Sequence, residues 1–238
     1  MSDGQDAILV ALILVAAVTG VGFAWGRRRS RAIALRVSRE LERALDPTDA
    51  TYTWIGGLIG FHARFEVGRG IREAKATLTL MPRHAPLYLP VALVLGRTDR
   101  LHVTLYLESG FGGEGHVILD RALRSPLLRI EGRERMVERA VAAGGKGYTL
   151  LATDRMLLER MEGILGSALR RGLVPALRHV ALVPDLATLY VQVVPSDGAA
   201  EAAVRLLAED VRGVGGSAGA ARMSDQESDS GEEKGGMQ

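Results

Sequence analysis

The chain has 238 residues, 47% of them hydrophobic, which suits one medium-sized domain with appendages. It contains no cysteine, and this excludes disulfides, thiolate zinc sites and cysteine nucleophiles. The net charge of +2 is unevenly distributed: residues 1–26 carry −2 and residues 224–238 carry −4, so residues 27–223 carry +8. This positive charge favours anionic partners such as lipid headgroups or RNA, and it does not discriminate between the two.

The first feature along the chain is an uncharged run over residues 7–25, AILVALILVAAVTGVGFAW. As a helix rising ~1.5 Å per residue it would be about 28 Å long, close to the ~30 Å hydrocarbon core of a bilayer. A cleaved signal peptide carries positive charge before its apolar stretch, whereas here the charge follows it. The run therefore predicts a transmembrane helix over residues 7–26, after a short extracytoplasmic N-terminus of residues 1–6.

A basic segment, GRRRSR, follows the run directly. Because positive charge beside a span stays on the cytoplasmic side, we expect a single-pass protein of the cell membrane with its N-terminus outside. Residues 27–213 are then a cytoplasmic domain. The same arginines are expected to contact anionic membrane lipid, at about 1 kcal/mol each near the surface. They are Arg27, Arg28, Arg29 and Arg31.

Local periodicity then predicts an α+β domain, with packed helices on a mixed or antiparallel sheet. The helices are expected at residues 30–45, 131–143, 154–171 and 198–212. The strands are expected at residues 51–60, 61–67, 74–82, 100–108, 115–120, 146–153, 178–184 and 188–195. The last two suit a hairpin, and 115–120 is expected to pair with 100–108. Residues 214–238 lack apolar periodicity and predict a disordered acidic tail.

Between two of these strands lies APLYLPVALVLG, residues 85–96, which is apolar nearly all round and too short to span a bilayer. Two interpretations stay open. Short apolar segments usually lie in the hydrophobic core, which favours a buried helix. The alternative is a helix pressed against the membrane surface or a membrane partner. In that case the contact residues would be Leu87, Leu89, Val91 and Leu93.

No catalytic or metal-binding motif emerges from the sequence. GFGGEG, residues 110–115, matches G-x-G-x-x-G, but a strand is expected after it where a dinucleotide site needs a helix, so we expect a hairpin loop. The five histidines show no metal-ligand spacing, and His102 is expected on the solvated face of its strand. We therefore expect no enzyme, no catalytic, cofactor or metal site, and no small-molecule ligand.

The order of these elements resembles the calumin-like family, the coiled-coil subunit of the PAT complex at the Sec translocon. Three stretches carry the resemblance: SRAIALRVSRELERAL (30–45), the strand–apolar helix–strand unit at 76–107, and LLATDRMLLERMEGILGSAL (150–169). The absence of asparagine and the excess of arginine over lysine favour a distant prokaryotic, archaeal-type relative. Two parts of that family are missing here, its long acidic lumenal region and its long basic coiled coil.

The resemblance implies a non-enzymatic accessory factor or chaperone in membrane-protein insertion or biogenesis, acting from the cytoplasmic face. Its partners would be Sec translocon subunits, nascent membrane proteins and the ribosome, although the ribosome-reaching coiled coil is absent. Two alternatives stay open. One is a membrane-anchored enzyme or ligand-binding domain, which predicts a deep pocket with convergent polar groups. The other is a structural subunit of a membrane complex.

Overall fold

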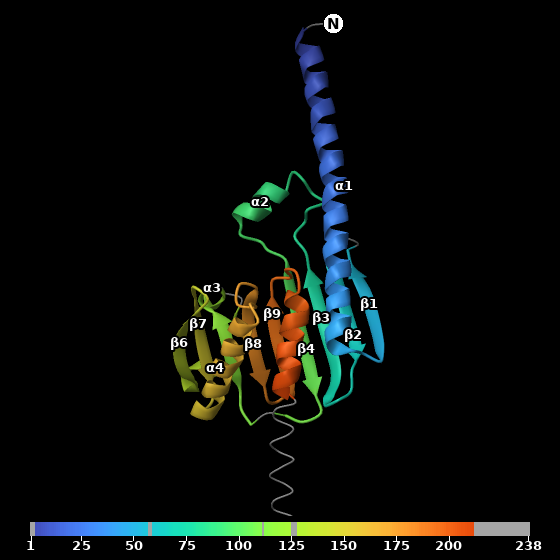
Figure 1. The fold of residues 1–238 in the computed structure, drawn as a ribbon. Helices are drawn as coiled ribbons and strands as arrows, with labels where there is room; N and C mark the ends of the chain where they lie inside the picture. The colour runs from blue at the N-terminus through green and yellow to red at the C-terminus, as the bar shows by residue number, and fades with distance from the viewer. Residues whose placement is uncertain (1–2, 57–58, 111, 125–127, 212–238) are drawn as a thin grey trace, which may run out of the picture.

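The computed structural model describes residues 3–56, 59–110, 112–124 and 128–211. These residues form one long N-terminal helix, a nine-stranded sheet and further helices, so the predicted α+β class is confirmed (Figure 1). The predicted acidic tail lies outside the described residues.

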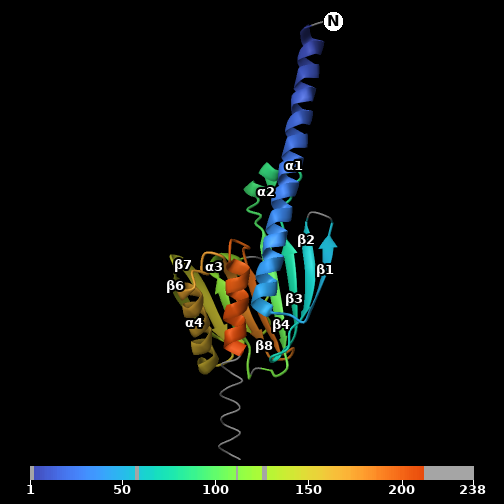
Figure 2. The same ribbon diagram turned by 45° about the vertical axis from the view of Figure 1, so that its right-hand side comes forward.

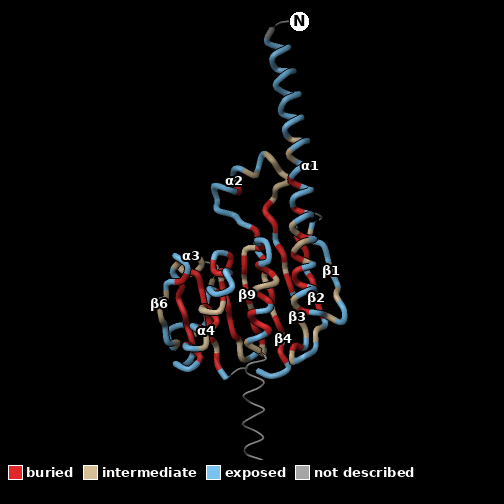
Figure 3. Tube along the Cα trace, viewed as in Figure 1, coloured by how far each residue is buried: buried red, intermediate tan, exposed pale blue. Residues whose placement is uncertain are grey.

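The first element is α1 (Asp3–Leu45), an unbroken helix that contains both the predicted transmembrane helix and the predicted helix over 30–45. Its C-terminal part packs against the sheet through Val37 and Leu41, which are fully buried because apolar residues recur there at helical spacing. The uncharged run extends away from the domain with exposed side chains (Figure 3). Among the described residues, α1 is the one helix long and apolar enough to cross a membrane.

The strands form a single antiparallel sheet in the order β1-β2-β3-β4-β9-β8-β5-β7-β6. All eight predicted strands are present with shifted ends, and β6 is the ninth. Their bounds are β1 Asp49–Ile55, β2 Gly60–Glu66, β3 Ile71–Thr79, β4 Arg100–Leu107, β5 Gly115–Leu119, β6 Val137–Ala143, β7 Lys146–Ala152, β8 Leu177–Val183 and β9 Thr188–Val193.

Two predictions about pairing have opposite outcomes. The β8–β9 hairpin is confirmed, with Leu182 opposite Leu189. The pairing of β5 with β4 is wrong, because β9 occupies the free edge of β4, as in the pair Val103 and Val191. Two strands therefore separate β4 from β5, and the glycine-rich segment between them is not a hairpin loop. A strand does follow that segment, as predicted.

The predicted helix over 131–143 is also wrong. Gly132 is in the left-handed conformation at φ 66°, a short 3-10 turn follows, and Val137–Ala143 is β6. Its full length pairs with β7, so tertiary pairing prevailed over the helical spacing of its Glu and Arg residues. As an edge strand, β6 carries exposed charge such as Glu138, a common protection against edge-to-edge association.

Helices cover one face of this sheet. They are the C-terminal part of α1, α4 (Arg155–Arg170) and a helix over 199–211, which we call the last described helix; both views show them on the same side (Figures 1 and 2). The predicted helix over 154–171 is confirmed, and Asp154 caps it by accepting a hydrogen bond from Leu157 N at 2.8 Å. The predicted helix over 198–212 corresponds to the last described helix.

The opposite face of the sheet carries more polar and more exposed side chains. On β4, Leu101 and Val103 are fully buried toward the helices, whereas His102 and Thr104 are only partly buried on the other side. This alternation is the one that the sequence predicts for residues 100–108. Side chains of β4, β5, β8 and β9 on this face are therefore placed to form a shared surface.

Candidate functional site

The chain between β3 and β4, residues 80–99, leaves the sheet at the end nearest the uncharged half of α1 (Figure 1). It contains α2 (Leu89–Val94), and we call it the α2 excursion. A bidentate ion pair closes its base: Arg83 donates to Asp99 Oδ1 at 2.7 Å and to Oδ2 at 2.6 Å. Asp99 also accepts from Met81 N at 2.8 Å, so one buried carboxylate holds both ends of the excursion together.

Two glycines of α1 let the α2 excursion approach the long helix closely. A Cβ atom on Gly26 would lie 2.0 Å from the carbonyl oxygen of Arg83, and one on Gly22 would lie 2.7 Å from Pro86 Cγ. A Cβ atom at either position would force a shift of the excursion or of α1, and the two positions lie one turn apart on one face of α1. The contact fixes the excursion beside Trp25, where the uncharged run ends.

The apolar side chains of α2 are not part of the core. Within α2 only Ala92 is buried, whereas the side chain of Val94 is 89% exposed. Of the predicted contact residues, Leu87, Val91 and Leu93 are exposed and Leu89 is partly buried. The interpretation of residues 85–96 as a buried helix is therefore wrong. The physical reason is that residues 83–86 make the contact with α1 and leave α2 projecting from it.

The four predicted arginines lie on the next turns of α1, all of them exposed. None forms an ion pair with a carboxylate in the part of the chain that the structure describes. Arg29 lies over the ring of Trp25, with its guanidinium carbon 5.6 Å from the ring centroid. The contact of Gly26 with Arg83 thus brings the basic segment of α1 and the α2 excursion to the same end of the domain, where α1 and α2 lie in Figure 1.

A cleft of about 670 Å³ lies at this same end of the sheet, on the face opposite the helices. Strand ends of β4, β5, β7, β8 and β9 line it, together with α3 (Asp120–Leu123) and with Gly96 and Thr98 of the α2 excursion. Four cationic side chains converge on it, so we call it the basic cleft. They are Arg100, Arg121, Lys146 and Arg178.

A β-bulge brings Arg178 into the basic cleft. Leu177 pairs with Val193 and His179 with Gln192, so Arg178 is the extra residue on β8. In a regular strand Arg178 and His179 would point to opposite faces, but here both line the cleft. A bulge of this kind commonly re-aims a side chain at a functional site.

Lys146 and Arg178 are tied to one backbone oxygen. Lys146 Nζ donates to the carbonyl oxygen of Pro175 at 2.8 Å, and Arg178 Nη1 donates to the same oxygen at 3.2 Å. Burial lowers the pKa of Lys146, and the nearby Arg178 lowers it further. Burial likewise lowers the pKa of Arg178; the Tyr148 phenol opposes this, and the charge of Arg121 adds to it. Arg178 therefore disfavours the charged form of Lys146, and Arg121 disfavours the charged form of Arg178.

Asp120 is the one carboxylate among the residues that line the basic cleft. Its Oδ1 accepts a hydrogen bond from Thr149 Oγ1 at 2.9 Å. Gly147 makes room for it, because a Cβ atom there would lie 2.1 Å from Asp120 Oδ2. Asp120 forms no ion pair with the four cations of the cleft in the described structure. The cleft therefore holds an excess of positive charge.

Histidines form the floor of the basic cleft and the sheet surface beside it. His102 Nδ1 lies 2.7 Å from the Tyr190 hydroxyl, and His116 Nδ1 lies 3.2 Å from His179 Nε2. Burial lowers the pKa of His102 and of His116, and it lowers the pKa of His179 to about 3. His116 Nε2 also lies 2.9 Å from a Glu114 carboxylate oxygen. These lowered pKa values favour the neutral imidazoles, which supply polarity without charge, although Glu114 opposes the shift at His116.

The sequence analysis missed this histidine group. His102 was expected to be solvated, yet it is half-buried and bonded to Tyr190. His116 and His179 are 63 residues apart, and they meet only because β5 and β8 are neighbours. The described residues contain no group of three His, Asp or Glu side chains suited to a metal ion. The cleft does have the convergent polar groups that the ligand-binding alternative predicts.

Comparison with known proteins gives little guidance for this chain. No family model and no curated protein matches it. Among solved structures, it is similar to the crystal structure of the mycobacterial trehalose monomycolate transport factor A, TtfA, at a TM-score of 0.32 and 11% identity. That match covers 74% of this chain and 94% of the other. A likeness of this size assigns neither a fold family nor a function.

Proposed function

We propose that this chain is a membrane-anchored accessory factor whose folded domain is held against the bilayer surface. In this proposal α1 crosses the membrane and the apolar side chains of α2 lie in the interface beside it. One observation carries the proposal: the α2 excursion leaves Leu87 and Val94 exposed, while Gly22 and Gly26 fix its base beside the end of the uncharged run. Exposed apolar surface of this kind is typical of a membrane or protein contact.

The orientation is part of the proposal. The exposed arginines follow the uncharged run, which favours a cytoplasmic domain and an N-terminus outside. Because the chain contains no cysteine, a thiol-reactive label attaches only at the introduced cysteine and reports on that position alone. In intact cells a membrane-impermeant maleimide should label Gln5→Cys, and it should label Glu159→Cys only after permeabilisation. The reverse pattern would contradict the orientation.

Contact between α2 and lipid is tested with the full chain in phosphatidylcholine nanodiscs. A nitrobenzoxadiazole label on Val94→Cys should emit at shorter wavelength than the same label on Glu159→Cys, and lipids carrying a quencher near the headgroup should quench it. Glu159 is the matched control because it is exposed on α4, away from the uncharged run. Equal emission and equal quenching at both positions would overturn the interfacial placement.

The narrower proposal is a role in membrane-protein insertion or biogenesis at the Sec translocon. The net charge of +8 on residues 27–223 and the exposed α2 support it, together with the resemblance of the element order. A photoreactive side chain at Leu93 in native membranes should crosslink to translocon subunits or nascent membrane proteins, and one at Glu159 should not. Capture of lipid alone at Leu93 would leave membrane anchoring intact and remove the translocon role.

A further inference from the structure

We propose that the basic cleft is a binding site for a phosphate group carried on a ligand with an apolar part. This inference does not depend on the translocon role. It rests on the charge, the hydrogen-bonding capacity, the shape and the position of the cleft.

The charge of the basic cleft favours an anionic ligand. Arg100, Arg121, Lys146 and Arg178 converge there, and the one lining carboxylate, Asp120, forms no ion pair with them in the described structure. Like charges held close together in a partly buried site repel one another, and an anionic ligand would relieve that repulsion. The lowered pKa of Lys146 and that of Arg178 agree with this repulsion.

Unused hydrogen-bond donors favour a phosphate, which offers several acceptor oxygens, over an anion with a single acceptor atom. Lys146 has three N–H donors and Arg178 has five, and their hydrogen bonds in the structure go to the carbonyl oxygens of Pro175 and Leu177. Within the residues that the structure describes, the remaining donors have no acceptor and are available to a ligand. A guanidinium fork pairs with two oxygens of a phosphate, and an ammonium group adds a point charge beside it.

The shape of the basic cleft indicates that the ligand is larger than inorganic phosphate. Its volume of about 670 Å³ is within the ~300–1,000 Å³ of typical small-molecule sites. Apolar residues also line it, among them Leu119, Leu128 and Val194. A ligand with a phosphate at the cationic side and an apolar part along these residues would satisfy both kinds of lining.

The position of the basic cleft agrees with a membrane amphiphile as the source of the phosphate. Gly96 and Thr98 line it, and they belong to the same excursion that carries α2 beside the end of the uncharged run. A phospholipid headgroup and a soluble organophosphate share the required chemistry. The experiment therefore includes both.

The test uses the full chain in dodecyl maltoside. In one arm, native mass spectrometry measures lipid retained from an equimolar mixture of phosphatidylglycerol and phosphatidylcholine. In the other arm, calorimetry measures binding of glycerol 3-phosphate and of inorganic phosphate. The variant is Lys146→Gln/Arg178→Gln. The matched control, Arg135→Gln/Arg155→Gln, removes the same charge from exposed arginines that do not line the cleft.

We expect the wild type and the control to bind at least one of these phosphates, and the cleft variant to bind it at least tenfold more weakly. Loss of phosphatidylglycerol retention alone would identify a lipid headgroup, and a parallel loss of glycerol 3-phosphate binding would identify a soluble source. The proposal is overturned if the cleft variant binds as the control does, or if the wild type binds no phosphate in either arm. Equal thermal unfolding of the two variants excludes misfolding as the cause.

Discussion

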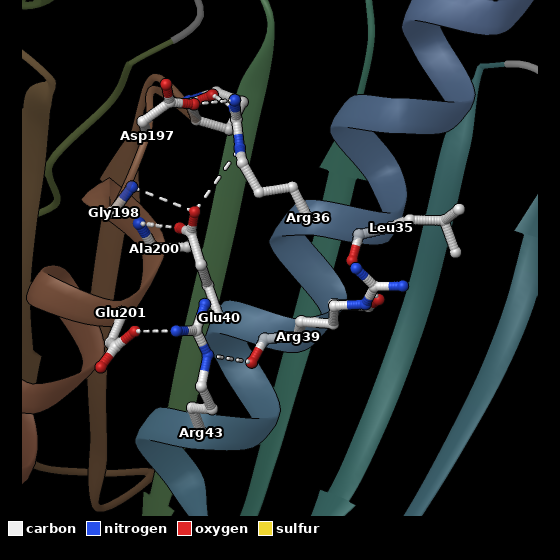
Figure 4. Close-up of polar contacts among 11 residues, drawn as sticks. Leu35, Arg36, Arg39, Glu40, Arg43, Asp197, Gly198, Ala200 and Glu201 are labelled. Atoms are coloured by element: carbon white, nitrogen blue, oxygen red, sulfur yellow. Dashed lines mark hydrogen bonds and ion pairs between the residues drawn. The ribbon is translucent and has the colours of Figure 1, made fainter.

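Glu40 of α1 caps the last described helix, which begins 159 positions further along the chain. Its Oε1 accepts a hydrogen bond from Gly198 N at 3.0 Å, and its Oε2 accepts one from Ala200 N at 3.2 Å (Figure 4). The Glu40 side chain is almost fully buried, and the neighbouring Arg36 pairs with it and with Asp197. The long helix is therefore joined to the domain by a charged cap in addition to its apolar face.

Replacing Glu40 with Ala should destabilise the fold. The change leaves two backbone N–H groups without their acceptor at a helix N-terminus, which costs roughly 1–3 kcal/mol of the free energy of unfolding. Urea unfolding of the full chain in detergent measures this. The control is Glu159→Ala, an exposed position on α4, which should change the free energy by less than ~0.5 kcal/mol. Equal effects at both positions would show that the cap contributes nothing.

A side chain at Gly26 should displace the α2 excursion from α1. In Gly26→Ala the new Cβ atom would meet the carbonyl oxygen of Arg83 at 2.0 Å, so one of the two backbones must shift. A nitrobenzoxadiazole label on Val94→Cys should then lose part of its wavelength shift in nanodiscs. Gly20→Ala is the matched control, because a Cβ atom at Gly20 meets nothing within 4 Å. An unchanged spectrum in Gly26→Ala would refute this account of how α2 is positioned.

Breaking the ion pair between Arg83 and Asp99 should loosen the base of the α2 excursion. Asp99→Asn leaves the partly buried guanidinium of Arg83 without its charged partner, and the loss of one member of a fully buried pair, an upper bound here, costs about 3–5 kcal/mol. We expect faster amide hydrogen exchange across residues 80–99, with the largest change at Met81, whose N–H donates to Asp99. Asp185→Asn, on the exposed β8–β9 turn, should leave this exchange unchanged.

Most of the helices and strands could be predicted from local periodicity. The alternation of Leu101, Val103 and Leu105 in β4, and the helical spacing that buries Leu158 and Met161 in α4, are direct consequences of which face each element buries. β6 could not be predicted in this way. Its spacing of charged and apolar residues also fits a helix, and only its pairing with β7 decides between the two.

The basic cleft could not be predicted, because strand order leaves no periodic signal in the sequence. Arg100, Lys146 and Arg178 are distant in the chain and meet only because β4, β9, β8, β5 and β7 are neighbours in that order. The close approach of the α2 excursion to α1, by contrast, does have a signal in the sequence. Gly22 and Gly26 form a G-x-x-x-G pattern, which is typical of close backbone approach on an apolar helix.

The neutral His179 should make the fold sensitive to acid. Its pKa is about 3 in the folded protein because burial disfavours the charged imidazole, whereas the unfolded chain takes up the proton near pH 6.5. Below pH 6.5 the unfolded state therefore binds more protons. This group's contribution to stability falls by about 1.4 kcal/mol for each further pH unit down to about pH 3. The contribution is fully present above pH 6.5.

His179→Gln isolates this effect, because glutamine cannot take up the proton while other titrating groups remain. Urea unfolding of the full chain should be compared at pH 7, 6 and 5 for the wild type and the variant. The wild type should lose stability more steeply than the variant between pH 6 and pH 5, by about 1 kcal/mol. Comparing slopes removes the constant cost of the substitution. Parallel pH profiles would mean that His179 takes up its proton at the same pH in the folded protein as in the unfolded chain, which would contradict a lowered pKa in the folded state.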